Sequence, residues 1–95
     1  MAAVAMLTLE LRLDDARSLK DRRQVVRSLK DKLRAKYNVA VAETDFQDWL
    51  SRAEVSVAAV GARAGDAEAV LERIERRAGE WLGRDLESAS IEVLE

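Results

Sequence analysis

Hydrophobic and polar residues alternate over some segments of this chain, and this alternation predicts strands. Between Met6 and Leu13, Leu7, Leu9 and Leu11 alternate with polar residues. Because successive side chains of a strand point to opposite faces, this segment should form a strand with one buried face. The same period predicts three further strands, at residues 39–42, 52–60 and 89–93.

A first helix is predicted from Leu19 to Lys36, where apolar residues recur every three or four positions. Ser18 precedes this segment and can accept a hydrogen bond from an amide of the first turn, near Asp21. Asn38 suits the left-handed conformation that often ends a helix. The apolar face of this helix comprises Leu19, Val26, Leu29 and Leu33.

A second helix is predicted between two glycine-containing turns. Gly61 and Gly65 bracket the first turn, Asp66 can cap the helix, and Gly83 can end it. The apolar stripe of this helix comprises Val70, Leu71, Ile74, Ala78, Trp81 and Leu82. Residues 43–51 separate the second and third strands and fit neither period, so we expect them to form a connection.

The resulting order is β-α-β-β-α-β, with a helix in each of two crossovers. Crossovers between parallel strands of one sheet are right-handed, which places both helices on the same face. The chain should therefore form one α+β domain, residues 1–95, with a ferredoxin-like sandwich of two helices on a four-stranded antiparallel sheet.

The composition excludes several kinds of catalytic site. The chain has no cysteine and no histidine, so it lacks thiolate nucleophiles, imidazole bases and the usual zinc ligands. We therefore expect neither an enzyme nor a cofactor, and no small-molecule substrate is evident. An alternative is a magnesium site formed by Glu43, Asp45 and Asp48, although no phosphate-binding loop accompanies these acids.

The same residues predict a cytoplasmic protein. The apolar N-terminal segment lacks the basic leader and the cleavage site of a signal peptide. No segment approaches the roughly 20 apolar residues that span a bilayer, so we expect no contact with a membrane.

Charge is distributed very unevenly along the chain. The segment from Arg17 to Lys36 contains nine basic residues and two acids, a balance of +7, whereas the rest of the chain has a balance of −9. Five of the bases fall within an arc of about 80° on the predicted helix. This basic row comprises Lys20, Arg23, Arg27, Lys30 and Arg34.

A row of like charges favours an anionic partner, and its spacing suits a phosphate backbone. RNA or the ribosome is therefore one hypothesis. Two alternatives remain at this point. The row can be a solvated helix face whose bases pair with neighbouring acids such as Asp31, or it can bind an acidic protein patch, including one on a second copy of the chain.

Arg22 lies in the middle of the apolar helix face, between Leu19 and Val26. Its aliphatic stem can pack there while its guanidinium group reaches solvent. The alternative that we favour is a partly buried ion pair with an acid of the second strand or the following connection, such as Glu43.

The connection also carries two aromatic residues, Phe46 and Trp49, which are candidates for an interface. The predicted sheet leaves one face without helices, and a partly apolar open face favours self-association into a dimer or larger oligomer. The alternative for Trp49 is that it folds back onto the edge of its own sheet. RNA-recognition motifs stack bases on sheet aromatics, but the outward positions here are Thr8, Glu10, Arg12, Glu54 and Ser56.

The chain resembles the YlxP-like family of small uncharacterised bacterial proteins over nearly its whole length. The resemblance rests on Ser18–Arg23 (SLKDRR) followed by Ser28-Leu29, and on Ala42-Glu43 with Gln47-Asp48 and Arg52-Ala53. It implies a ferredoxin-like fold and a role near the ribosome, and it brings no catalytic residues.

This chain departs from the family pattern at two positions. Arg22 stands where many members carry Lys, and Phe46 stands where others carry His. The first difference keeps the charge, whereas the second argues against a shared histidine in the connection.

Overall fold

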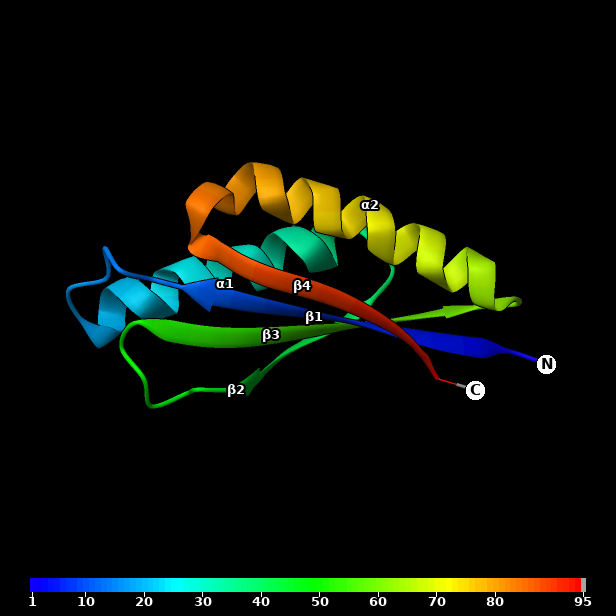
Figure 1. Cartoon of the computed structure of the whole chain (residues 1–95), viewed down its shortest axis with the longest axis horizontal. Helices are drawn as coiled ribbons and strands as arrows, with labels where there is room; N and C mark the ends of the chain where they lie inside the picture. Colours follow the sequence, from blue (N-terminus) through cyan, green and yellow to red (C-terminus); the bar gives the residue numbers. More distant parts are fainter. Residues whose placement is uncertain (95) are drawn as a thin grey trace.

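The computed structural model describes residues 1–94, which form four strands, two long helices and one 3-10 turn (Figure 1). The elements are β1 (Ala3–Arg12), α1 (Leu19–Lys36), β2 (Ala40–Asp45), β3 (Arg52–Gly61), α2 (Ala64–Leu82), η1 (Gly83–Asp85) and β4 (Leu86–Leu94). The order is β-α-β-β-α-β, as predicted, and the sheet is antiparallel throughout. The protein has the ferredoxin-like fold.

The strands are arranged in the order β2-β3-β1-β4, so β1 is central and β2 and β4 are the two edges. Both helices cover the same face of the sheet (Figure 1). α1 packs over β2 and β3, whereas α2 packs over β1, β3 and β4. No helix of residues 1–94 covers the other face, which we call the open sheet face.

The core lies between the sheet and the helices. It is built from the alternate residues of β1 and β3 that the period of two predicts, because these side chains all point to the helical face. The largest fully buried side chains are Leu7, Leu9, Leu11, Leu13, Leu33, Val55, Val57, Leu71 and Ile74. Leu13 follows β1 but is held in place because its amide donates a hydrogen bond to the carbonyl of Ser51 at 2.7 Å.

Three strands are longer than the sequence pattern predicts. β1 already begins at Ala3, which pairs with Gly61. β2 continues to Asp45, which pairs with Glu54 across an irregularity in the register, although residues 43–45 were expected in the connection. β4 begins at Leu86 rather than at Ala89. In each case a neighbouring strand supplies backbone hydrogen bonds where the side-chain alternation is weak.

α1 ends at Lys36, as predicted, but two predicted features of the helix ends are wrong. α2 begins at Ala64 with Arg63 at its N-cap position, so Asp66 lies inside the first turn and does not cap the helix. After α1, the C-cap residue Tyr37 has an extended backbone, and among the non-glycine residues of the described chain only Phe46 has a positive φ. Asn38 is therefore not left-handed.

Two other predicted features of the helix ends are confirmed. The side chain of Ser18 accepts a hydrogen bond from the amide of Asp21 at 3.1 Å and so caps α1. Gly83 ends α2 with a φ of 55°, a conformation that strongly favours glycine. Within residues 1–94, neither helix is long and apolar enough to cross a lipid bilayer.

Candidate functional site

The basic row follows the flank of α1 that lies beside the edge strand β2. The guanidinium of Arg34 fixes this placement, since its Nη2 atom donates a hydrogen bond to the carbonyl of Val41 at 2.8 Å. Lys30 is half-buried and the other four cations of the row are exposed. The opposite flank of α1, with Gln24, Ser28 and Lys32, faces α2. The predicted row is therefore a continuous surface feature along the outer side of the helix.

No carboxylate of the described chain pairs with a cation of the basic row. The ion pairs of residues 1–94 lie elsewhere, between Arg12 and Glu87, Arg22 and Glu43, Arg52 and Glu10, Arg52 and Glu87, Arg77 and Glu80, and Arg84 and Asp15. Asp31 belongs to none of these pairs, although it follows Arg27 by one helical turn. The acidic body of the protein thus leaves the charge of the basic row without direct compensation.

Arg22 connects α1 to the segment between β2 and β3. Its side chain is 3% exposed, and its guanidinium forms the predicted ion pair with Glu43. The same group donates hydrogen bonds to the carbonyls of Phe46 at 2.7 Å, of Trp49 at 2.5 Å and of Arg52 at 3.0 Å. A planar guanidinium suits this arrangement because its donors form a rigid fork. The position of the connection is therefore set by one side chain of the first helix.

The three carbonyl acceptors of Arg22 could not be found from the sequence. Every residue has a backbone carbonyl, so a carbonyl acceptor leaves no mark in the residue types. Only the apolar position of Arg22 on the helix and the presence of an acid near the connection were visible. These two signals were enough to find the ion pair but not the bonds around it.

Phe46, Trp49 and Arg52 form a small cluster at the end of the connection, which we call the aromatic cluster. The two rings meet edge to face, with 5.4 Å between their centroids. The guanidinium carbon of Arg52 lies 4.2 Å from the ring centroid of Phe46 and 5.7 Å from that of Trp49. Phe46 is half-buried, whereas Trp49 is 54% exposed. Trp49 thus contacts its neighbours but remains largely open to solvent.

The aromatic cluster lies at one end of the open sheet face. Arg52 places it there, because its side chain pairs with Glu10 of β1 at 3.6 Å and with Glu87 of β4 at 3.9 Å. The prediction that the strands themselves present no aromatic residue on this face is right. However, the connection adds aromatic rings to its edge, which the strand pattern alone did not indicate.

The rest of the open sheet face is less charged. A shallow hollow of about 240 Å³ lies over β1, β2 and β3 and is lined by Met6, Ala40, Ala42, Thr44, Ser56 and Ala58, with Val41. At the far end of the sheet, Val60 is 71% exposed and Leu94 is 40% exposed. The open face therefore has one apolar end and one end with ion pairs and aromatic rings.

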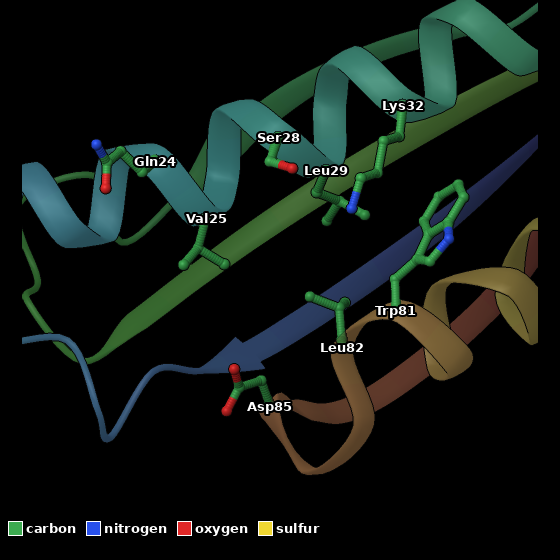
Figure 2. Close-up of a pocket in the computed structure, with 8 residues that line it drawn as sticks. All are labelled: Gln24, Val25, Ser28, Leu29, Lys32, Trp81, Leu82 and Asp85. Atoms are coloured by element: carbon green, nitrogen blue, oxygen red, sulfur yellow. The ribbon is translucent and has the colours of Figure 1, made fainter.

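A groove of about 330 Å³ separates the two helices (Figure 2). Figure 2 shows Lys32 of α1 pointing toward Trp81 of α2, and the Nζ atom lies 5.3 Å from the ring centroid. The guanidinium of Arg77 lies 5.5 Å from the same ring. Val25 and Leu82 add apolar walls. The helical period assigns Trp81 to the apolar stripe, whereas in the structure the residue is only half-buried and lines this groove.

The acids of the connection do not assemble into a metal site. Glu43 pairs with Arg22, and a carboxylate oxygen of Asp45 accepts a hydrogen bond from the amide of Phe46 at 2.8 Å. Across the described residues, no three Asp, Glu, His or Cys side chains are grouped so that they could hold a metal ion. The alternative with Glu43, Asp45 and Asp48 thus has no geometric support.

The profile of a family described as "Protein of unknown function (DUF503)" matches residues 4–92. The chain belongs to the DUF503 family. The predicted resemblance to YlxP-like proteins is confirmed, since a relative is the "Uncharacterized protein YlxP" of Bacillus subtilis (strain 168), 33% identical over 60 residues. That match covers 63% of this DUF503 chain and 65% of the Bacillus protein.

Among solved structures, this DUF503 chain is similar to the solution NMR structure of a de novo designed protein with a ferredoxin fold. The TM-score is 0.47 and the sequences are 21% identical, with 99% of this chain and 84% of the designed protein covered.

Proposed function

We propose that this DUF503 protein is a cytoplasmic binding module, not an enzyme, which docks the basic row of α1 on RNA, either free or within the ribosome. One observation carries the proposal. The five cations of the row lie along one helix flank, and no carboxylate among residues 1–94 forms an ion pair with them.

The physical argument concerns repulsion between these cations. Neighbouring positions on a helix flank lie about 5–6 Å apart, so their charges repel each other when no counter-charge is present. A phosphate backbone removes this repulsion and releases its own condensed counterions on binding. Arg22 supports this function indirectly, since its bonds to Glu43 and to the connection fix α1 on the sheet.

The proposal predicts binding that weakens steeply with salt. If Arg23, Arg27 and Lys30 each neutralise one phosphate, they contribute roughly 2 to 3 to the slope of log K against log salt. We would measure binding of the purified protein to 30S, 50S and 70S ribosomes and to structured RNA, from low to physiological salt. Retained binding to one particle at physiological salt is the expected result for a role in translation.

A matched pair of variants distinguishes the contribution of the basic row to RNA affinity from the contribution of the overall net charge. The double substitution R23E/R27E reverses two exposed cations of the row, and R73E/R76E reverses two exposed arginines of α2. Both variants change the net charge by the same amount. We expect R23E/R27E to lose most of the affinity and R73E/R76E to keep it. Equal loss in both variants would mean that only the overall charge matters, and unchanged binding of R23E/R27E would refute the proposal.

A second candidate function is self-association through the open sheet face. It is favoured by the exposed side chains of Val60 and Trp49, which are 71% and 54% accessible, and by the apolar hollow around Met6. Such an assembly would also bring two basic rows into one particle. Sedimentation velocity at micromolar concentration should then show a dimer or larger oligomer that W49A dissociates, whereas a monomer would contradict this candidate.

A further inference from the structure

The backbone of Trp49 is bonded to the helical turn where the basic row begins, although Trp49 belongs to a different part of the chain. Its carbonyl accepts the hydrogen bond from Nε of Arg22 at 2.5 Å. Arg22 lies directly before Arg23 and two residues after Lys20, which are the first two members of the row. The side chain of Arg22 therefore links the backbone of Trp49 to the turn of α1 where the row begins.

The ring of Trp49 is both held and accessible. Phe46 contacts it edge to face at 5.4 Å, and Arg52 lies 5.7 Å from its centroid, so two neighbours restrict its orientation. The side chain is nevertheless 54% exposed, the highest value among the large hydrophobic residues of the described chain except Val60 and Met1. A ring that is already positioned loses little conformational freedom when a planar group stacks on it.

We propose that the RNA partner presents unpaired nucleotides, one of which stacks its base on Trp49 while its backbone follows the basic row. This inference rests on the proposed function and specifies its ligand class. A cationic track that is continued by an exposed aromatic ring is the combination by which proteins bind single strands without reading sequence. In a paired A-form helix the bases are stacked on each other and cannot be splayed onto a side chain.

The position of the aromatic rings explains how this protein can stack a base although its strands carry no aromatic side chain on the open sheet face. Thr8, Glu10 and Ser56 occupy the middle of the open sheet face, so a base cannot stack there as it does on an RNA-recognition motif. The connection instead supplies the ring at the end of the sheet nearest to the first turn of α1. The ligand would therefore run along the side of the domain and not across the sheet.

The two tryptophans of the chain allow a direct test. In a W81F protein, Trp49 is the sole tryptophan. In a W49F protein, Trp81 is the sole tryptophan. Each protein is titrated at low salt with single-stranded oligouridylate and with a fully paired RNA duplex of equal length. We expect the single strand to quench the fluorescence of Trp49, the duplex to leave it nearly unchanged, and neither RNA to quench Trp81.

Affinity gives a second readout. W49A should weaken binding of the oligouridylate by roughly 5- to 140-fold, the range expected when one stacked base is lost. W49F keeps an aromatic ring and should retain part of this affinity. Binding of the duplex should stay within about twofold in both variants, because its bases do not reach the ring. Both variants should fold, since the carbonyl of Trp49 and not its ring is the acceptor of Arg22.

The variants also separate this inference from the proposed function. If R23E/R27E abolishes binding of both RNAs while W49A changes neither, the basic row binds RNA but the stacking inference is refuted. If R23E/R27E binds as well as the unaltered protein, the proposed function itself fails. If the fluorescence of Trp49 changes with protein concentration in the absence of RNA, the ring is covered by a second copy of the chain, which also overturns the inference.

Discussion

Replacing Arg22 by methionine should destabilise the protein severely. Methionine keeps an unbranched apolar stem for the buried position but removes the guanidinium group. The carboxylate of Glu43 then loses its ion pair, and the carbonyls of Phe46, Trp49 and Arg52 lose their donor. We expect a loss of about 3–5 kcal/mol in the free energy of unfolding, because one partner of a buried pair is left uncompensated.

The expected loss of stability follows from the number of bonds that Arg22 makes and from how exposed their partners are. A hydrogen bond to a charged group contributes about 1.5–3 kcal/mol, so four independent acceptors would give a larger total than we expect. However, the acceptors share one guanidinium and are not independent. The side chain of Glu43 is 17% exposed, which lets water replace part of the lost interaction. A small domain has a total stability of roughly 5–15 kcal/mol, so the expected loss is a large part of it.

Equilibrium unfolding in urea, followed by far-UV circular dichroism, measures the effect. The matched control is R23M, because Arg23 is the next residue on the same helix, is exposed and forms no ion pair within residues 1–94. R23M should change the stability by no more than about 0.5 kcal/mol. The double variant R22M/E43Q should be more stable than R22M, since it no longer buries an unpaired carboxylate. A loss below about 1 kcal/mol for R22M would refute our view that this arginine fixes the connection, given the usual cost of breaking such a pair.

Two further substitutions test the local structure. S18A removes the oxygen that accepts from the amide of Asp21 and should cost about 1 kcal/mol of stability in the same unfolding assay; no loss would mean that water caps α1 equally well. L71A leaves a cavity beneath α2, where Leu71 is 0% exposed, and should cost about 2–5 kcal/mol; a smaller loss would show that α2 can move toward the sheet and fill the space.

The fold was predictable because the period of two residues in the strands differs clearly from the period of 3.6 residues in the helices. Leu7, Leu9 and Leu11 alternate strictly and all lie in the core, which left no ambiguity about the buried face of β1. Element ends were harder to predict. Asp66 was a reasonable cap by residue type, but the backbone enters the helix at Ala64, where no side chain caps it. Residue types indicate which caps are possible, whereas the path of the chain decides which one is used.

The candidate site was predictable where it depends on one helix and not where it depends on contacts between distant segments. The basic row follows from helical geometry alone, so its members could be named from their spacing. The link between Trp49 and the first turns of α1 is a hydrogen bond from Arg22, which lies 27 positions earlier, and the sequence holds no periodic signal for such a bond. The groove between the helices was missed for the same reason, since Trp81 and Lys32 belong to separate helices.

The central position of β1 has a consequence for synthesis of the protein. Of the four strands of this sheet, β1 is made first, but its hydrogen-bonding neighbours are β3 and β4, the third and fourth to be made. After Arg12 has been added, the chain must grow by 82 residues before the end of β4 at Leu94 exists. At about 5–20 residues per second this takes roughly 4–16 s. During that time the most apolar strand of the protein has at least one unpaired edge, which is the kind of surface that other chains can pair with. Newly made chains are therefore most vulnerable to aggregation before β4 has been added.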